Sequence, residues 1–60
     1  MKKYNIYAKL LGAFTLVFVA NDIDFAKDFA KTYNRVNETA VIVKTDNGAQ
    51  IDDKDFLFYK

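Results

Sequence analysis

The chain has 60 residues, of which 52% are hydrophobic and 17% aromatic, and its formal net charge is +1. This length gives one small domain over residues 1–60, and so apolar a composition excludes an intrinsically disordered chain. A nearly neutral chain has no general attraction for nucleic acid or for an anionic membrane, and its longest apolar stretch, residues 14–20, is too short to span a bilayer.

The first third of the chain predicts a β-hairpin. Residues 4–10 and 14–20 are rich in β-branched and aromatic types and are separated by a glycine. A three-residue loop over 11–13 places apolar residues opposite one another on one face, whereas a two-residue loop sets Lys9 against Phe14. We therefore expect the longer loop. Its predicted pairs are Leu10 with Phe14, Ala8 with Leu16, Ile6 with Phe18, and Tyr4 with Ala20.

Residues 22–36 change from the strand period of two to the helical period of about 3.6 residues. Asn21 is expected to cap the helix N-terminus, and Asn37, which tolerates a left-handed backbone, is expected to end the helix. Phe29 lies in the middle of the apolar arc and should be buried against the sheet. The apolar arc consists of Ile23, Phe25, Ala26, Phe29, Ala30, Tyr33 and Val36.

A second hairpin is expected after the helix. Residues 39–45 predict a strand, and Asp46-Asn47-Gly48 is a strong turn signal. A three-residue loop sets Val43 opposite Ile51 and keeps the apolar face intact. Beyond Ile51 a run of acidic residues breaks the pattern, so a bend is expected before residues 56–59 resume as a strand. The predicted fold class is α+β in the order β-β-α-β-β, a four-stranded, mainly antiparallel sheet with one amphipathic helix on one face.

The residue types that are absent exclude most catalytic chemistry. The chain has no His, Cys, Ser, Trp or Pro, and its single arginine is Arg35. Nucleophilic catalysis and zinc sites draw mainly on the missing types, and two distant glycines cannot form a phosphate-binding loop. The aspartates of the C-terminal third lack the spacing of a calcium loop and are interpreted as solvated turn residues. We therefore expect no enzymatic activity, no cofactor and no metal.

The sheet face away from the helix is the candidate functional site. One helix cannot cover both faces of a four-stranded sheet, and an exposed apolar cluster there would be unusually large for a monomer. The hypothesis is a contact surface, either between two copies stacked sheet to sheet or with a partner protein. The alternative is that the C-terminal segment folds back over the cluster, or that the apolar residues are scattered. The expected interface residues are Tyr7, Lys9, Val17, Val19 and Ile42, with Tyr7 and Val17 as cross-strand neighbours.

A further indication comes from Tyr4, Tyr7 and Ala8 on the first strand, Val19 and Asn21 at the end of the second, and Ala26 and Ala30 on the helix. With these residues, positions 4–34 resemble the β-β-α units that are common in small phage and mobile-element accessory proteins. The resemblance implies a non-enzymatic protein that acts by binding. It transfers no functional residue to this chain.

The sequence therefore favours a small protein-binding module, with a protein partner or as a homodimer and with no membrane association. A phage origin would make it an inhibitor or modulator of a host or defence protein. We expect a cytoplasmic location, because the chain has no cysteine and its first residues do not have a signal-peptide pattern. The alternative function is a single-stranded nucleic-acid-binding accessory protein, because Tyr7 beside Lys9 is similar to the aromatic platforms on which single strands stack. Against it, 8 acidic residues nearly balance 9 basic ones.

Overall fold

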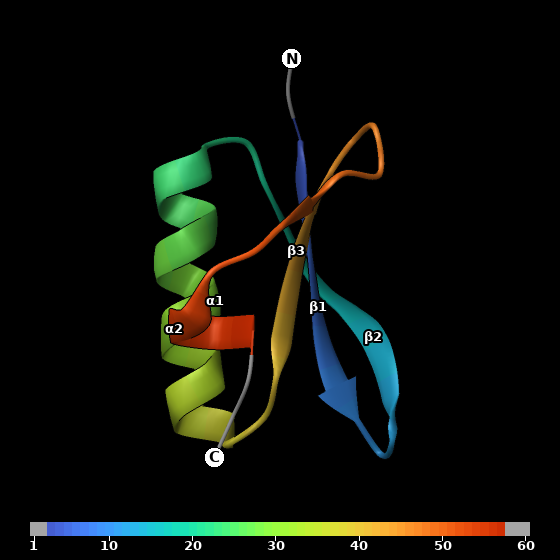
Figure 1. Cartoon of the computed structure of the whole chain (residues 1–60), viewed down its shortest axis with the longest axis vertical. Coiled ribbons are helices and arrows are strands. Elements are labelled where there is room, and N and C mark those ends of the chain that lie inside the picture. The colour runs from blue at the N-terminus through green and yellow to red at the C-terminus, as the bar shows by residue number, and fades with distance from the viewer. Residues whose placement is uncertain (1–2, 58–60) are drawn as a thin grey trace.

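The computed structural model describes residues 3–57 and shows a four-stranded antiparallel sheet with a long helix beside it (Figure 1). The sheet order is β2-β1-β3-β4, so β2 and β4 are the edge strands. The elements are β1 (Tyr4–Leu10), β2 (Ala13–Ala20), α1 (Ile23–Asn37), β3 (Val41–Thr45), β4 (Gln50–Ile51) and α2 (Lys54–Leu57). The predicted α+β class and the β-β-α-β-β order are confirmed, and α2 is an addition to them.

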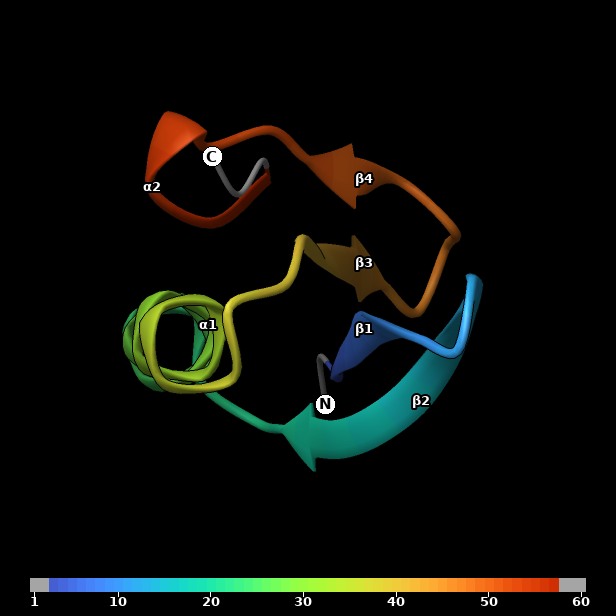
Figure 2. The same ribbon diagram turned by 90° about the horizontal axis from the view of Figure 1, so that it is seen from below.

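The core lies between the central strands and the two helices. Figure 2 shows α1 and α2 on the same side of β1 and β3, so both helices cover one sheet face. The face that they cover carries small and β-branched residues, which let the layers approach closely. The buried apolar residues are Tyr4, Ile6, Ala8, Ala20, Ala26, Ala30, Val41, Val43 and Phe56.

The first hairpin differs from the prediction in its loop. Leu10 pairs with Ala13 and Lys9 with Phe14, so the loop has two residues, and both have positive φ, 51° at Leu11 and 83° at Gly12. The backbone twist of such a turn matches the right-handed twist of the two strands, and this match outweighs the apolar pattern that favours a longer loop.

A β-bulge then restores the predicted pairing further along the hairpin. The register shifts between Ile6 and Tyr7, so that Ile6 faces Phe18 as expected while Tyr7 faces Leu16. Val17 is the extra residue on β2. The predicted pairing of Ala8 with Leu16 is therefore wrong, and the predicted pairing of Ile6 with Phe18 is right.

Both caps of α1 lie one residue later in the chain than predicted. The Asp22 carboxylate accepts a hydrogen bond from the Phe25 amide at 2.9 Å, so Asp22 is the N-cap in place of Asn21. The helix includes Asn37, and the left-handed residue that ends it is Glu38, with φ 52°.

The buried side of α1 is narrower than the predicted apolar arc. Ala26, Ala30 and Asn34 are buried, while Phe25 and Val36 are 54% and 66% exposed. Phe29 is only half-buried, and its ring stacks on Phe18. The small alanines let the helix sit close to the sheet, and this leaves the larger side chains at its margin.

The second hairpin forms as predicted. Val43 pairs with Ile51, and the three-residue loop closes with a hydrogen bond from the Gly48 amide to the Thr45 carbonyl oxygen at 2.9 Å. Gly48 has φ 85°, a conformation that costs glycine little because it has no Cβ.

The predicted final strand is wrong over its first two residues. Phe56 and Leu57 belong to α2, and residues 58–59 lie outside the described part of the chain. Phe56 is completely buried, and its carbonyl oxygen accepts a hydrogen bond from the Asn34 side-chain amide at 3.1 Å. A short helix with one deep anchor thus replaces the expected strand.

Candidate functional site

The sheet has an outer face, defined as the face away from α1. Residues opposite each other in a ladder share a face, and Ile6, Ala8, Val41 and Val43 face the helix with no exposed surface. The residues between them on their strands therefore belong to the outer face. The outer face consists of Asn5, Tyr7, Lys9, Phe14, Leu16, Val19, Ile42 and Lys44.

Tyr7 lies in the middle of the outer face, with Leu16 on one side and Ile42 on the other. The Lys44 Nζ atom lies 5.8 Å from the centroid of the Tyr7 ring, within cation–π range. Tyr7 and Ile42 are both half-buried, and Lys9 is exposed. Tyr7, Lys9 and Ile42 are thus three of the four predicted interface residues that lie on the outer face.

The other two predicted residues have different environments. Val19 lies opposite Asn5 on the outer face and is exposed. Val17 is half-buried and packs against the core, because the two-residue turn sets Leu16 beside Tyr7 and the next residue along the strand points to the other face. The prediction that Tyr7 and Val17 are cross-strand neighbours is therefore wrong. Leu16, not Val17, lies opposite Tyr7.

Six of the nine large hydrophobic residues that are exposed in the described chain lie on the first hairpin, an exposure that was not predicted, and we call this group the apolar hairpin surface. It extends over the turn and both sides of β2, with Leu11 fully exposed, Leu16 50% exposed and Phe14 46% exposed. The predicted register had placed Phe14 and Leu16 under the helix. The apolar hairpin surface consists of Leu10, Leu11, Phe14, Leu16, Phe18 and Val19.

The strand that carries this surface is an edge strand with few of the usual protections. Proteins commonly protect an edge with charged residues, proline or a short strand. β2 has eight residues and none of them is charged or a proline, although the bulge at Val17 interrupts it. The opposite edge, β4, has only two residues. A signal was present in the sequence, since β2 lies within residues 10–21, the longest segment of the chain without a charged residue.

A hollow of about 400 Å³ adjoins the apolar hairpin surface where β2 leads into α1. The rings of Phe18 and Phe25, whose centroids are 5.8 Å apart, contribute to its apolar lining. It is lined by Phe18, Val19, Ala20, Asn21, Asp22 and Phe25. A side chain of a partner could enter this hollow while the strand edge is engaged.

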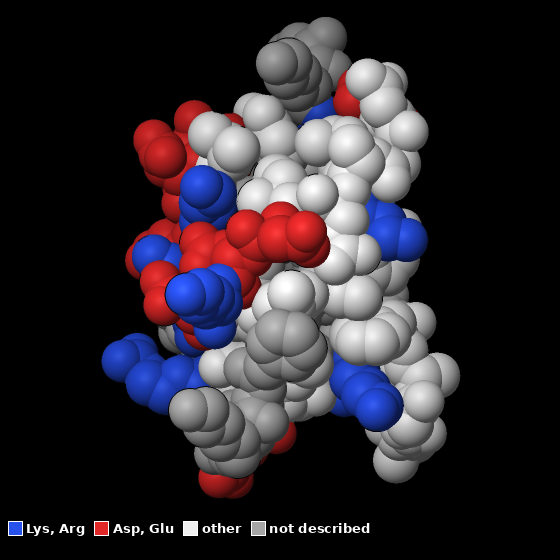
Figure 3. Space-filling view, in the orientation of Figure 1, with Lys and Arg blue, Asp and Glu red and all other residues white. Residues whose placement is uncertain are grey.

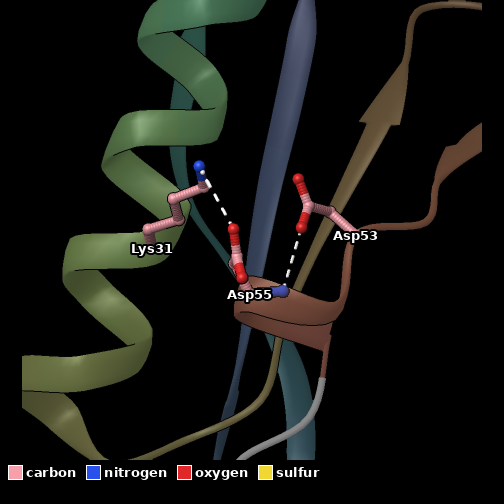
Figure 4. Close-up of polar contacts among 3 residues, drawn as sticks. All are labelled: Lys31, Asp53 and Asp55. Carbon is pink, nitrogen blue, oxygen red and sulfur yellow. Dashed lines mark hydrogen bonds and ion pairs between the residues drawn. The ribbon is translucent and has the colours of Figure 1, made fainter.

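The charged residues are concentrated elsewhere. Figure 3 shows Asp, Glu, Lys and Arg side chains gathered over the helices, whereas the side of the sheet is mostly uncharged. Between α1 and α2, the Lys31 Nζ atom lies 3.3 Å from an Asp55 carboxylate oxygen, and both side chains are largely exposed (Figure 4). Such a surface ion pair adds little to stability, so this region is a solvated face.

The C-terminal aspartates have structural roles in the described chain. The Asp53 carboxylate accepts a hydrogen bond from the Asp55 amide at 2.9 Å and so stabilises the start of α2 (Figure 4). Within residues 3–57, no group of three or more acidic side chains could hold a metal ion. Residues 52–57 lie on the helix side of the sheet, so they do not cover Tyr7 and Ile42.

Across the described residues, no helix combines the length and apolar character needed to cross a membrane. Comparison of the chain with protein-family models, with curated proteins and with solved structures found no match.

Proposed function

We propose that this chain is a non-enzymatic protein-binding module that acts through the apolar hairpin surface. One observation carries the proposal, namely that β2 exposes large apolar side chains on both of its faces and at its turn. Burial of apolar area is a dominant favourable contribution to association between proteins. Phenylalanine and leucine side chains held on a sheet lose little conformational freedom when a partner covers them.

The type of surface favours a macromolecular partner over a small substrate. The apolar hairpin surface follows a strand and a turn. The hollow beside it is open to solvent, so it suits a side chain of a partner better than an enclosed small molecule. Small-molecule sites in contrast enclose most of the ligand. The absence of His, Cys and Ser from the sequence agrees with a role in binding.

The biological role that we propose is inhibition or modulation of a host or defence protein in the cytoplasm. This step rests on the resemblance of residues 4–34 to phage and mobile-element units and on the small size of the chain. A small module with one strong contact surface suits this role, because it can occupy a site on a larger protein without chemistry of its own.

The test compares two substitutions that each place a lysine on an exposed apolar position. Leu16→Lys changes the apolar hairpin surface, and Val36→Lys changes the exposed side of α1. A partner captured from host extract is identified and purified, and its dissociation constant is measured with each variant. Leu16→Lys should weaken binding at least tenfold and Val36→Lys should not. Equal affinity for wild type and Leu16→Lys would exclude the proposed surface.

Single-stranded nucleic acid is the second candidate ligand, favoured by the position of Tyr7 between two lysines. Lys9 lies two residues along the strand, and Lys44 contacts the Tyr7 ring. Binding of this kind would weaken steeply as salt is raised, because phosphate contacts release counterions. Anisotropy of a labelled oligothymidine, measured over a salt series with wild type and Lys44→Gln, separates this function from protein binding. Salt-dependent binding that is lost in Lys44→Gln would favour the second function.

A further inference from the structure

We infer that the apolar hairpin surface first binds a second copy of this chain, through antiparallel pairing of β2 with the partner's β2. The inference rests on the proposed function and specifies its partner and geometry. The pairing is edge to edge and would join two four-stranded sheets into one. This geometry differs from the sheet-to-sheet stacking that the sequence suggested. Edge pairing satisfies the unpaired backbone groups of β2 and also brings the exposed side chains on both of its faces into the contact.

The backbone of β2 offers hydrogen-bonding groups in the right place. A two-residue turn closes on a hydrogen-bonded pair, which here is Leu10 and Ala13. Because the direction of the amides alternates along a strand, the amide and carbonyl groups of Phe14 and Leu16 point away from β1. They form the free edge, and they lie before the bulge at Val17, where the strand is regular.

This pattern fixes the register of the pairing. A twofold axis at Thr15 places Phe14 opposite the partner's Leu16, with both sets of edge groups facing each other. On the outer face the two Phe14–Leu16 pairs are apolar, and on the other face the exposed Thr15 side chains meet. Apolar pairs and Thr–Thr pairs are both favourable across strands. The contact is self-complementary, as a twofold dimer requires.

Charge agrees with a second copy as the partner. No charged residue lies on β2, so the pairing brings no like charges together along the strand. Lys9 lies beside the N-terminal end of β2, and Asp22 follows its C-terminal end. With the axis at Thr15, Lys9 lies level with the partner's Leu16 and Asp22 extends past the partner's turn, so neither residue meets a like charge across the pairing.

The size of the contact implies a weak dimer. A standard interface covers about 800 Å² on each partner, roughly a fifth of the 4249 Å² accessible surface of this chain. The short regular part of β2 buries less than this, so a larger partner could displace the second copy. Self-pairing would then protect the edge until the partner arrives.

A cysteine at the twofold axis tests this geometry directly. The chain has no cysteine, so Thr15→Cys provides a single thiol. Across the axis the two Cα atoms would be about 4.5 Å apart, within the range of a disulfide. Oxidised glutathione should therefore convert Thr15→Cys to a covalent dimer at least ten times faster than Val36→Cys. Equal rates for the two variants would overturn the inference.

Sedimentation equilibrium of charge variants gives an independent measurement. Wild type and Thr15→Val should associate between micromolar and near-millimolar concentration, and Thr15→Lys, which places like charges at the axis, should stay monomeric. Circular dichroism confirms that each variant is folded. Association that survives Thr15→Lys but not Leu16→Lys would show stacking of outer faces and overturn edge pairing. A monomeric wild type that still binds a partner through Leu16 would also overturn it, while leaving the proposed function intact.

Discussion

The ring of Phe29 on α1 stacks on the ring of Phe18 on β2, with centroids 4.7 Å apart and an angle of 16° between the ring planes. This pair joins the helix to the edge strand, where the two elements otherwise make limited contact. Tyr33 continues the aromatic row beyond Phe29, at a centroid distance of 6.0 Å. Because Phe18 is still partly exposed, this junction is a margin of the core and also a margin of the apolar hairpin surface.

Replacement of Phe29 by alanine should destabilise the protein by about 2–3 kcal/mol, somewhat less than the loss for a fully buried phenylalanine. The reason is that Phe29 is half-buried, and that its replacement removes the ring contacts with both Phe18 and Tyr33. Phe25→Ala is the matched control, since Phe25 is more exposed, and should cost about 1 kcal/mol. Urea unfolding of both variants measures the difference. Equal losses would contradict the assigned burial of the helix.

The second prediction concerns Asn34, a buried polar residue on α1. Its Nδ2 atom donates to the carbonyl oxygens of Thr39, at 2.8 Å, and Phe56, at 3.1 Å. Asn34→Ala leaves these acceptors without that donor and should cost about 2 kcal/mol. Amide exchange of Phe56 and Leu57 should also accelerate, because α2 loses its attachment to α1.

Asn37→Ala is the control for this measurement. Asn37 also donates through Nδ2, to the Tyr33 carbonyl oxygen at 3.3 Å, but in an exposed position. Water can replace an exposed bond, so Asn37→Ala should change stability by less than about 0.5 kcal/mol. If both asparagine variants lost the same stability, burial would not be the cause.

The elements and their order could be predicted from the sequence because each depends on local periodicity and turn residues. The alternation of residues 4–10 and the helical arc of residues 22–36 both survive in the structure. The Asp46-Asn47-Gly48 loop has the predicted register because the turn and the apolar pattern favour the same pairing. At the first turn these two factors conflict. The Leu11-Gly12 turn sets the register next to it. The bulge at Val17 then shifts the pairing by one residue, so that Phe18 lies opposite the buried Ile6.

The candidate site was harder to predict because it depends on tertiary packing. The outer face could be inferred from alternation, and Tyr7 and Ile42 lie on it. Alternation shows neither the two-residue turn, which places Leu16 on the outer face and Val17 towards the core, nor the bulge, after which Phe18 again faces Ile6. Nor does it give the sheet order that makes β2 an edge. Because Val17 packs against the core, Val17→Lys should affect folding. Leu16 is exposed, so Leu16→Lys is the substitution that tests binding.

The third prediction concerns the second turn. Gly48 has φ 85°, and a Cβ added there would meet nothing within 4 Å. The cost of Gly48→Val therefore comes from the backbone alone and should be about 1–2 kcal/mol. Gly48→Asn should cost less, because asparagine tolerates the left-handed region. Thermal unfolding of the pair measures this difference, and equal melting temperatures for the valine variant and wild type would contradict the turn geometry.

The last prediction concerns Leu11, which combines a left-handed backbone with a side chain that is fully exposed. Leucine at φ 51° carries a backbone cost of about 1 kcal/mol, and strain of this kind often marks a functional position. Leu11→Asn, with the residue favoured at this turn position, should raise stability by about 0.5–1 kcal/mol and the melting temperature by a few degrees.

The same substitution should weaken partner binding or self-association, because it removes an apolar side chain from the apolar hairpin surface. Leu11→Ala is the control, since alanine keeps the backbone strain but also removes the side chain. It should weaken binding as much as Leu11→Asn does, without the gain in stability. Thermal unfolding and sedimentation of the two variants separate the effects. A gain in stability with unchanged association would show that Leu11 lies outside the contact, because strain would then be relieved at no functional cost.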